Sequence, residues 1–363
     1  MNAHARSPIP LRPDRDALGR AGARSLTRAC FAIARHQLGP YGGASSEQIA
    51  ESLWPSDGTA TFITRAASSP AMTTGTWGTS LAASAVRDFI SSLVPLSAAA
   101  KLFDAAVPVS LDGVNSISFP YRSGAIDPAA VWVAQGAPIP TIQLSLTSAT
   151  LGPMHKLAII ASLTRETAEH ASGEAVLTTL LRENAARALD ASLFSSTPGT
   201  ADRPPGLLAG ISALSGAPAG DDAALSSDLS TLANAISDDA AGLVYVAHPA
   251  QANTIRLRRG TTFPADIEVW ASLGVSEGVV IALDPLAVVS AFGAEPEISA
   301  SQEAVIHQET SPAQIGTPGS PATVAAPVRS LWQTDTIGVK LILRAAWALR
   351  APGAVAWIQN TTW

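Results

Sequence analysis

"SGEAVLTTLLRENAARALDASLF", residues 172–194, is the most regular stretch of this chain and predicts one long amphipathic helix. Its apolar residues recur at steps of three and four and so line one stripe: Val176, Leu177, Leu180, Leu181, Ala185, Ala188, Leu189 and Leu193. The charged residues lie mostly off that stripe: Arg182, Glu183, Arg187 and Asp190. At 1.5 Å per residue the helix would be about 34 Å long, roughly twice a typical globular helix. Taken alone, the pattern indicates a core helix of a large domain.

Length and composition describe a folded chain. It has 363 residues, of which 47% are hydrophobic, enough for two or three packed units. No run of about 18 apolar residues occurs without a charge or a proline, so we predict no transmembrane helix and no membrane partner. Cys30 is the only cysteine, which excludes an internal disulfide and a thiolate metal cluster.

Charge is distributed unevenly along the chain. Residues 1–36 contain seven arginines against Asp14 and Asp16, a local charge of +5, which leaves −11 for the remainder of a chain whose net charge is −6. Such a basic start is typical of nucleic-acid contact through phosphates. A solvated or partner-binding helix with Leu18, Leu26 and Ile33 turned inward is the interpretation that we place first, and a transit peptide is a third.

The remaining regions are separated by proline and glycine. Helices are predicted at 14–38, 46–54, 79–103 and 222–238. Short alternating runs punctuated by proline predict an extended hairpin over 115–152. Strands are predicted at 156–163, in a compact α/β unit after residue 242, at 296–306, and at 336–349 and 353–359. Four prolines in 307–330 predict an exposed loop between two strands.

A search for catalytic and ligand-binding motifs finds none. The chain has no G-x-x-x-x-G-K-[ST], G-x-G-x-x-G, H-E-x-x-H or G-x-S-x-G sequence. Its histidines never pair at a spacing of two to four residues: 4, 36, 155, 170, 248 and 307. We therefore predict no catalytic residues, no metal and no cofactor, although a triad assembled only in space stays open.

The order of these parts resembles the major capsid protein of tailed bacteriophages. Four stretches carry the resemblance: "VWVAQGAPIP" at 131–140, "LGPMHKLAIIASLTRETAEHA" at 151–171, "RPPGLLAGI" at 203–211 and "LWQTDTIGVKLILRAAWALRAPGAVAWIQ" at 331–359. They span about two thirds of the chain, and the motifs describe a fold and not a reaction. The chain departs from the family where Gln135 stands in place of a typical glutamate, and where "SSTPGTAD" replaces a glycine-rich turn.

The resemblance implies an α+β fold of the Hong Kong 97-like phage capsid type. Its implied parts are an N-terminal arm or scaffolding-like segment (1–114), an extended loop hairpin (115–152), a peripheral domain with a long spine helix (153–207), an axial domain (208–294) and the C-terminal strands of the peripheral domain (295–363). In this arrangement the long helix is a structural beam.

The resemblance also implies a function. The chain would be a major capsid, or head, protein that assembles into an icosahedral shell around double-stranded phage DNA, and it would not be an enzyme. Its implied partners are other copies of itself as pentamers and hexamers, scaffold and portal proteins, and packaged DNA on the inner face. Its implied location is the virion, after assembly in the cytoplasm of a bacterial host.

Two sets of residues are candidates for assembly contacts. Trp132, Val133 and Ile139 are expected to contact neighbouring subunits from the hairpin, with packing inside their own subunit as the alternative. The basic start would face DNA or scaffold through Arg12, Arg15, Arg20, Arg24, Arg28 and Arg35.

Some members of this family join their subunits by a bond between lysine and asparagine. Because Lys101, Lys156 and Lys340 all lie outside the hairpin, we predict no such crosslink. Two other functions stay open at this point. One is the shell protein of an encapsulin, and the other is a soluble α/β enzyme with a hidden site.

Overall fold

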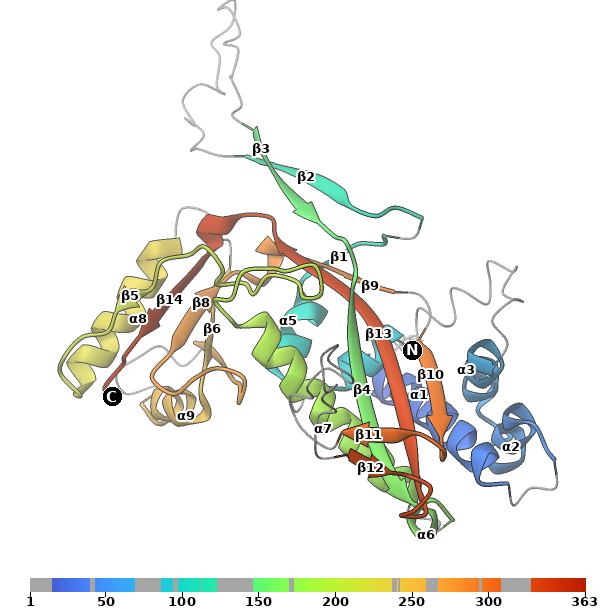
Figure 1. Ribbon diagram of the computed structural model, residues 1–363. Helices are drawn as coiled ribbons and strands as arrows, with labels where there is room; N and C mark the ends of the chain where they lie inside the picture. Colours follow the sequence, from blue (N-terminus) through green and yellow to red (C-terminus); the bar gives the residue numbers. More distant parts are fainter. Residues whose placement is uncertain are drawn as a thin grey trace, which may run out of the picture. The chain divides into compact units, whose positions relative to one another are not determined.

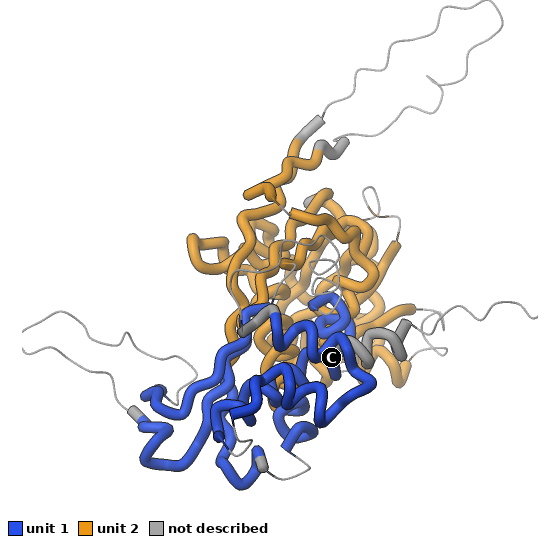
Figure 2. The backbone as a smooth tube through the Cα atoms, turned by 90° about the vertical axis from the view of Figure 1, so that its right-hand side faces the viewer, with its two compact units in different colours: residues 1–92, 160–179, 294–341 blue, residues 93–159, 180–293, 342–363 orange. Residues whose placement is uncertain are grey.

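The computed structural model describes residues 15–39, 43–68, 86–93, 97–111, 113–122, 146–169, 173–236, 240, 242–258, 267–293, 296–307 and 328–363. Figure 2 shows the two compact units that they form. Unit 1 comprises residues 1–92, 160–179 and 294–341, and unit 2 comprises residues 93–159, 180–293 and 342–363. Three elements run through both units: β4 (His155–Thr164), α7 (Gly173–Leu193) and β13 (Thr336–Leu349) (Figure 1).

Unit 1 contains a group of helices that begins near the start of the chain. They include α1 (Arg15–Leu38), α2 (Ser46–Leu53), α3 (Gly58–Ser68) and α6 (Arg165–Glu169). α1 and α2 lie where they were predicted, whereas α3 was not predicted. α2 begins with a capping box, because the Ser45 hydroxyl accepts from the Gln48 N–H and the Gln48 side chain accepts from the Ser45 N–H.

The prediction of one helix over 79–103 is wrong. Residues 86–92 are helical, and a separate helix, α5 (Ala98–Ala105), follows. Ser97 has extended backbone dihedrals, and its hydroxyl accepts from the Ala100 N–H, as at a helix N-terminus. The helical pattern of residues 79–103 therefore runs past Ser97, although Ser97 caps the start of a separate helix.

Unit 1 also contains three short strands: β10 (Glu297–Ser301), β11 (Val305–His307) and β12 (Val328–Ser330). β11 and β12 form an antiparallel pair, with Ile306 opposite Arg329. They stand on either side of the predicted loop, which confirms that a strand lies at each end of it. Residues 308–327 themselves lie outside the described residues.

A five-stranded sheet forms the centre of unit 2. In spatial order its strands are β5 (Leu214–Ser215), β14 (Val355–Gln359), β8 (Val280–Leu283), β6 (Val244–Ala247) and β7 (Glu268–Ala271). Two helices, α8 (Asp222–Ile236) and α9 (Pro249–Leu257), contribute to one core with one face of this sheet. That core includes Leu225, Leu229, Leu232, Ile236, Tyr245, Ala252, Ile255, Ala282, Ala356 and Ile358. The predicted α/β unit is present.

The strands of the C-terminal part do not stay together. β14 pairs antiparallel with β8, with Ala356 opposite Ala282, so the last strand completes the sheet of the α/β unit. β9 (Val288–Phe292) follows β8 after the short helix η2 (Pro285–Ala287), but it belongs to the other five-stranded sheet. There it pairs with β13 and with β1 (Val107–Pro108). The strand order of that sheet is β1, β9, β13, β10, and β4 also pairs with β13. A second short helix, η3 (Pro352–Ala354), lies between β13 and β14. The sequence order of the strands therefore did not reveal which sheet each one joins.

The long helix of the opening pattern is present as α7, but its buried face differs from the predicted stripe. Leu177, Leu181, Ala185, Leu189 and Leu193 are buried as expected. Val176 and Leu180, which also belong to the stripe, are 41% and 38% exposed, and Ala188 of the stripe is exposed as well. Asp190, which was placed off the stripe, is only 2% exposed. A polar residue thus occupies the buried side of the helix near its C-terminus.

The thiol of Cys30 on α1 is expected to resist modification. Its side chain is fully buried, and burial raises the pKa of Cys30 from 9.0 to about 12. At pH 8 the thiolate fraction would be on the order of one in ten thousand, so a maleimide should label the unfolded protein but not the native one. Because the unfolded thiol ionises near pH 9 and the folded thiol near pH 12, its contribution to stability is lost as the pH rises through that interval. Labelling of the native protein at the rate of a free thiol would contradict this burial.

Candidate assembly elements

The hairpin predicted at 115–152 begins as a regular two-stranded ribbon. β2 (Ile117–Arg122) and β3 (Leu146–Leu151) pair antiparallel from Ile117 opposite Leu151 to Arg122 opposite Leu146. This pairing confirms the two ends of the hairpin. Ser118, Ser148 and Thr150 are exposed, so part of the ribbon presents polar side chains to solvent.

The base of this hairpin is anchored in unit 2. Leu151 is fully buried in a cluster with Leu111, Val289, Ala291 and Ala346, and Ile117 and Phe119 pack against that cluster. Next to it, Gly152 has φ +106°, and a Cβ there would lie 2.5 Å from the Asn115 carbonyl oxygen. Only glycine fits this close approach of the two strands. The first residues of the hairpin are therefore held in a defined direction.

The three apolar residues proposed for contacts from the hairpin, Trp132, Val133 and Ile139, lie outside the described residues. Their contacts with a neighbouring subunit stay a prediction.

A pocket of about 320 Å³ lies beside the hairpin base in unit 2. Its walls include Thr150, Pro153, Pro205 and Trp347, and the Trp347 indole donates to the Pro205 carbonyl over 2.8 Å. Among the described residues that line it, His155 is the one titratable side chain. These residues alone do not supply the several titratable groups that general acid–base catalysis uses.

The described residues contain neither a cluster of metal ligands nor a membrane-spanning helix. No group of three or more His, Cys, Asp or Glu side chains is placed to hold a metal ion in the described part of the chain. None of the helices described is long and apolar enough to cross a membrane.

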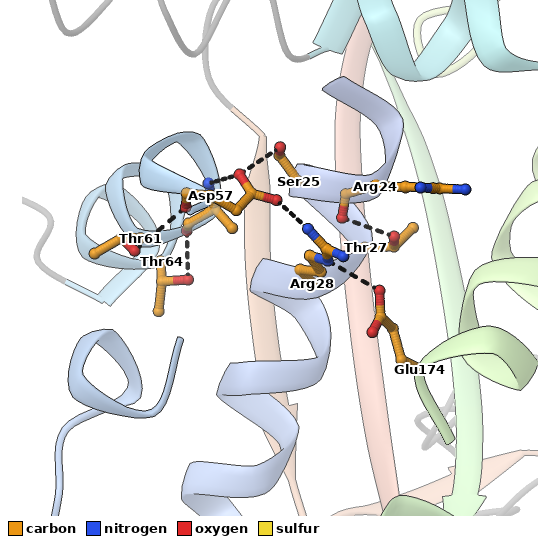
Figure 3. A network of polar contacts seen from close by, with 9 residues as sticks. Arg24, Ser25, Thr27, Arg28, Asp57, Thr61, Thr64 and Glu174 are labelled. Carbon is orange, nitrogen blue, oxygen red and sulfur yellow. Dashed lines mark hydrogen bonds and ion pairs between the residues drawn. The ribbon is translucent and has the colours of Figure 1, made fainter. Parts of the chain in front are cut away.

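An ion-pair network connects α1 to α3 and α7 inside unit 1 (Figure 3). The Arg28 guanidinium donates to Asp57 Oδ2 at 2.8 Å and to Glu174 Oε1 at 3.1 Å. Asp57 also accepts from the Ser25 hydroxyl at 2.7 Å and, at the start of α3, from the Ala60 N–H at 3.0 Å. One carboxylate thus caps α3 and pairs with an arginine of α1.

The six arginines proposed to face DNA or scaffold fall into two groups. Nothing is described of the side chains of Arg12, Arg15 and Arg20. Arg24 is exposed, whereas Arg28 joins the network above and Arg35 donates to the Ala168 carbonyl oxygen at 2.9 Å. These contacts support the packed-helix interpretation for Arg28 and Arg35. DNA or scaffold contact stays a prediction for the set.

In unit 2, the buried carboxylate of Asp190 connects three segments. It accepts from the hydroxyls of Ser97 and Ser272, and from the backbone N–H groups of Ala98 and Ala99 at 3.2 and 3.0 Å. The acceptor on α7 therefore satisfies the first amides of α5 and the turn after β7. A negative charge at a helix N-terminus is also favourable for the helix dipole.

The comparison with protein families covers these same elements. Residues 84–262 match the model of the phage capsid family, a range that contains the hairpin, β4, α7, α8 and α9. The chain belongs to this family. It is a major capsid protein with the Hong Kong 97-like fold, a structural and not an enzymatic protein, and its place is the virion.

Solved structures similar to the capsid protein come from phages and from a gene-transfer particle. The one from Mycobacterium phage Bobi is 16% identical, with 71% of this chain and 89% of that chain covered and a TM-score of 0.47. The one from Microbacterium phage Oxtober96 is 16% identical, with 73% and 90% covered and a TM-score of 0.47. A structure titled "Capsid of empty GTA particle computed with C5 symmetry" is 16% identical, with 73% and 91% covered and a TM-score of 0.46. No curated protein matches the sequence.

Sequence reasoning missed the residues that hold these elements together. Asp190 lay at the edge of the apolar stripe, one position after Leu189 and three before Leu193, which was the only sign of its burial. Arg28 was assigned to a charged arm, although it is four residues before Ala32 and three after Ser25 on a partly apolar helix. Its partners Asp57 and Glu174 are 29 and 146 residues away, so no local pattern could have paired them.

Proposed function

We propose that the capsid protein builds the shell of a tailed-phage head by assembling as pentamers and hexamers of itself around double-stranded DNA. The family match over residues 84–262 carries this proposal, because it spans the hairpin, the long helix, and α8, β6 and α9 of the α/β unit. Scaffold and portal proteins are the further proposed partners. Among the alternatives, an encapsulin shell would enclose cargo enzymes in place of DNA.

In this proposal the hairpin, residues 115–152, is the extended loop that reaches over a neighbouring subunit. Its described arms bury few side chains apart from those at the base, and a thin ribbon of two strands is marginal by itself. Contacts with Trp132, Val133 and Ile139 would supply the missing burial. In a closed shell such contacts recur in every subunit, so many contacts that are each weak together stabilise the particle.

The remaining regions have proposed places in the shell. Residues 153–207 and 295–363 would form most of the peripheral domain with α7 as its spine, and residues 208–294 the axial domain at the fivefold and sixfold centres. The pairing of β14 with β8 supports adding the last strand to the axial sheet.

Assembly of the purified chain is the direct test. We would express the full chain alone and then with the scaffold gene of its own locus, size the products by light scattering, and image them by negative-stain electron microscopy. We expect closed shells, or pentamers and hexamers with tubes and sheets. A monodisperse monomer under both conditions would reject a shell function. DNA in purified filled particles separates a phage head from an encapsulin, whose particles would contain enzyme.

The basic start is proposed to face the packaged DNA or a scaffold. Changing Arg12, Arg15 and Arg20 together to Gln removes three of the charges available for phosphate contacts. We expect a lower ratio of filled to empty particles, measured by sedimentation. Variant particles that fill with DNA as completely as those of the unmodified protein would contradict this proposal.

We expect the mature shell to contain no covalent bond between subunits. Lys101 lies in α5, Lys156 in β4 and Lys340 in β13, so none belongs to the proposed extended loop. A denaturing gel of purified particles should show the subunit as a single band. A ladder of covalent multimers is the opposite result and would show that one of these lysines reacts.

A further inference from the structure

The N-terminal helices are built into the core of unit 1. Several side chains of α1 are completely buried: Leu26, Ala29, Cys30, Ala32 and Ala34. α1 contacts α2, α3, α6 and β10, and the last two of these come from distant parts of the sequence. The segment that begins at Arg24 is therefore packed against strands and helices of the shell subunit, and it is not a separate arm.

Polar contacts fix the same helix to the start of α7. Arg28 pairs with both Asp57 and Glu174, and its guanidinium carbon lies 5.3 Å from the centre of the Trp54 ring. Figure 3 shows Arg28 between the two carboxylates, one on each side. Glu174 is in the first turn of α7, so removal of α1 would leave this partly buried acid without its arginine.

Close packing adds a third connection between these segments. A Cβ at Gly173, the first residue of α7, would lie 3.0 Å from the ring of Phe31 and 2.2 Å from the Thr167 carbonyl oxygen. Arg35 donates to the Ala168 carbonyl oxygen in α6. The aromatic ring and the arginine of α1 thus cover the α6–α7 segment closely, and their loss would uncover the buried Ala168.

We infer that residues 24–68 stay in the mature particle as a permanent part of the shell subunit. If a protease processes the subunit during maturation, it then cuts before Arg24 or after residue 68. If it cuts after residue 68, residues 24–68 stay bound to the rest of the subunit. This inference rests on the proposed function, because a mature particle exists only if the protein assembles into a shell. It predicts that this part of the N-terminal arm or scaffolding-like segment is retained in the particle and not removed.

The first test is a peptide map of the subunit from purified filled particles. Peptides from residues 24–68 should be present in the same molar amount as peptides from α7 and α8. Filled particles that contain α7 and α8 peptides but lack those of 24–68 would overturn the inference. Particle formation itself tests the proposed function, so the two results are read independently.

A second test uses the full chain in solution and needs no particle. Hydrogen exchange of the α1 amides from residue 24 to 38 should be as slow as that of α7. If α1 exchanges at the rate of an unfolded peptide while α7 stays protected, the segment is not part of the fold and the inference fails.

Matched variants on α1 show whether the ion-pair network holds the segment. Arg28→Met removes both ion pairs, and we expect thermolysin to cleave within residues 24–68 at least tenfold faster. Arg24→Met changes an exposed arginine one turn earlier on the same helix, and cleavage should stay within twofold of the unmodified chain. Equal cleavage of the two variants would show that the network does not retain the segment.

Discussion

Asp190→Ala is expected to destabilise unit 2 strongly and to impair assembly of the shell. The change removes four hydrogen bonds to a carboxylate that is 2% exposed, and it leaves the hydroxyls of Ser97 and Ser272 and the first amides of α5 without an acceptor. Each buried group left unsatisfied costs about 1–3 kcal/mol, so we expect a total of about 4 kcal/mol or more. Total stability of a domain is only about 5–15 kcal/mol. Soluble yield, thermal unfolding and particle formation measure the result.

Two control variants define the cause. Asp190→Asn keeps the shape and one acceptor oxygen but removes the charge, so its loss of stability should be smaller than that of alanine. Asp202→Ala changes an exposed aspartate in the loop after α7 and should alter stability by no more than about 0.5 kcal/mol. An Asp190→Ala protein that assembles and melts like the unmodified one would show that the junction of α5, α7 and the β7 turn is not important for stability.

Gly206→Ala is the second change with a large expected effect. A Cβ at this position would lie 1.9 Å from the Ser195 carbonyl oxygen, well inside any allowed contact. The chain turns back here onto the end of α7, where the N–H of Leu207 donates to the Leu193 carbonyl and that of Leu208 to the Ser195 carbonyl, at 2.8 and 3.2 Å. Alanine must push these two backbone segments apart, so we expect the free energy of unfolding to fall by about 3 kcal/mol.

A melting temperature measures this second effect. For a unit of this size a loss of about 3 kcal/mol corresponds to a decrease of roughly 6–12 °C. Gly58→Ala is the matched control, because nothing lies within 4 Å of a Cβ at that position and its φ is not in the left-handed region. Equal melting temperatures of the two alanine variants would show that the close contact at Gly206 does not require glycine.

Local pattern alone was enough to predict the regular elements of the capsid protein. α7, α1, α8, the arms of the hairpin and the strands β13 and β14 lie where apolar periodicity and turn residues placed them, because these signals depend on neighbours within a few residues. The order of these elements along the chain also led to the right family and fold. The absence of catalytic motifs agreed with a structural protein.

Tertiary structure alone decided how those elements are joined. β14 pairs with β8 and not with β13, Asp190 is buried because it satisfies amides 91 and 92 residues away, and Arg28 is held by Glu174, 146 residues away. A sequence pattern cannot show such pairs, since the energy of a buried polar group depends on which distant partner folding brings to it. That is why the opening stripe was right about the helix and most of its buried face, but wrong about Val176, Leu180, Ala188 and Asp190.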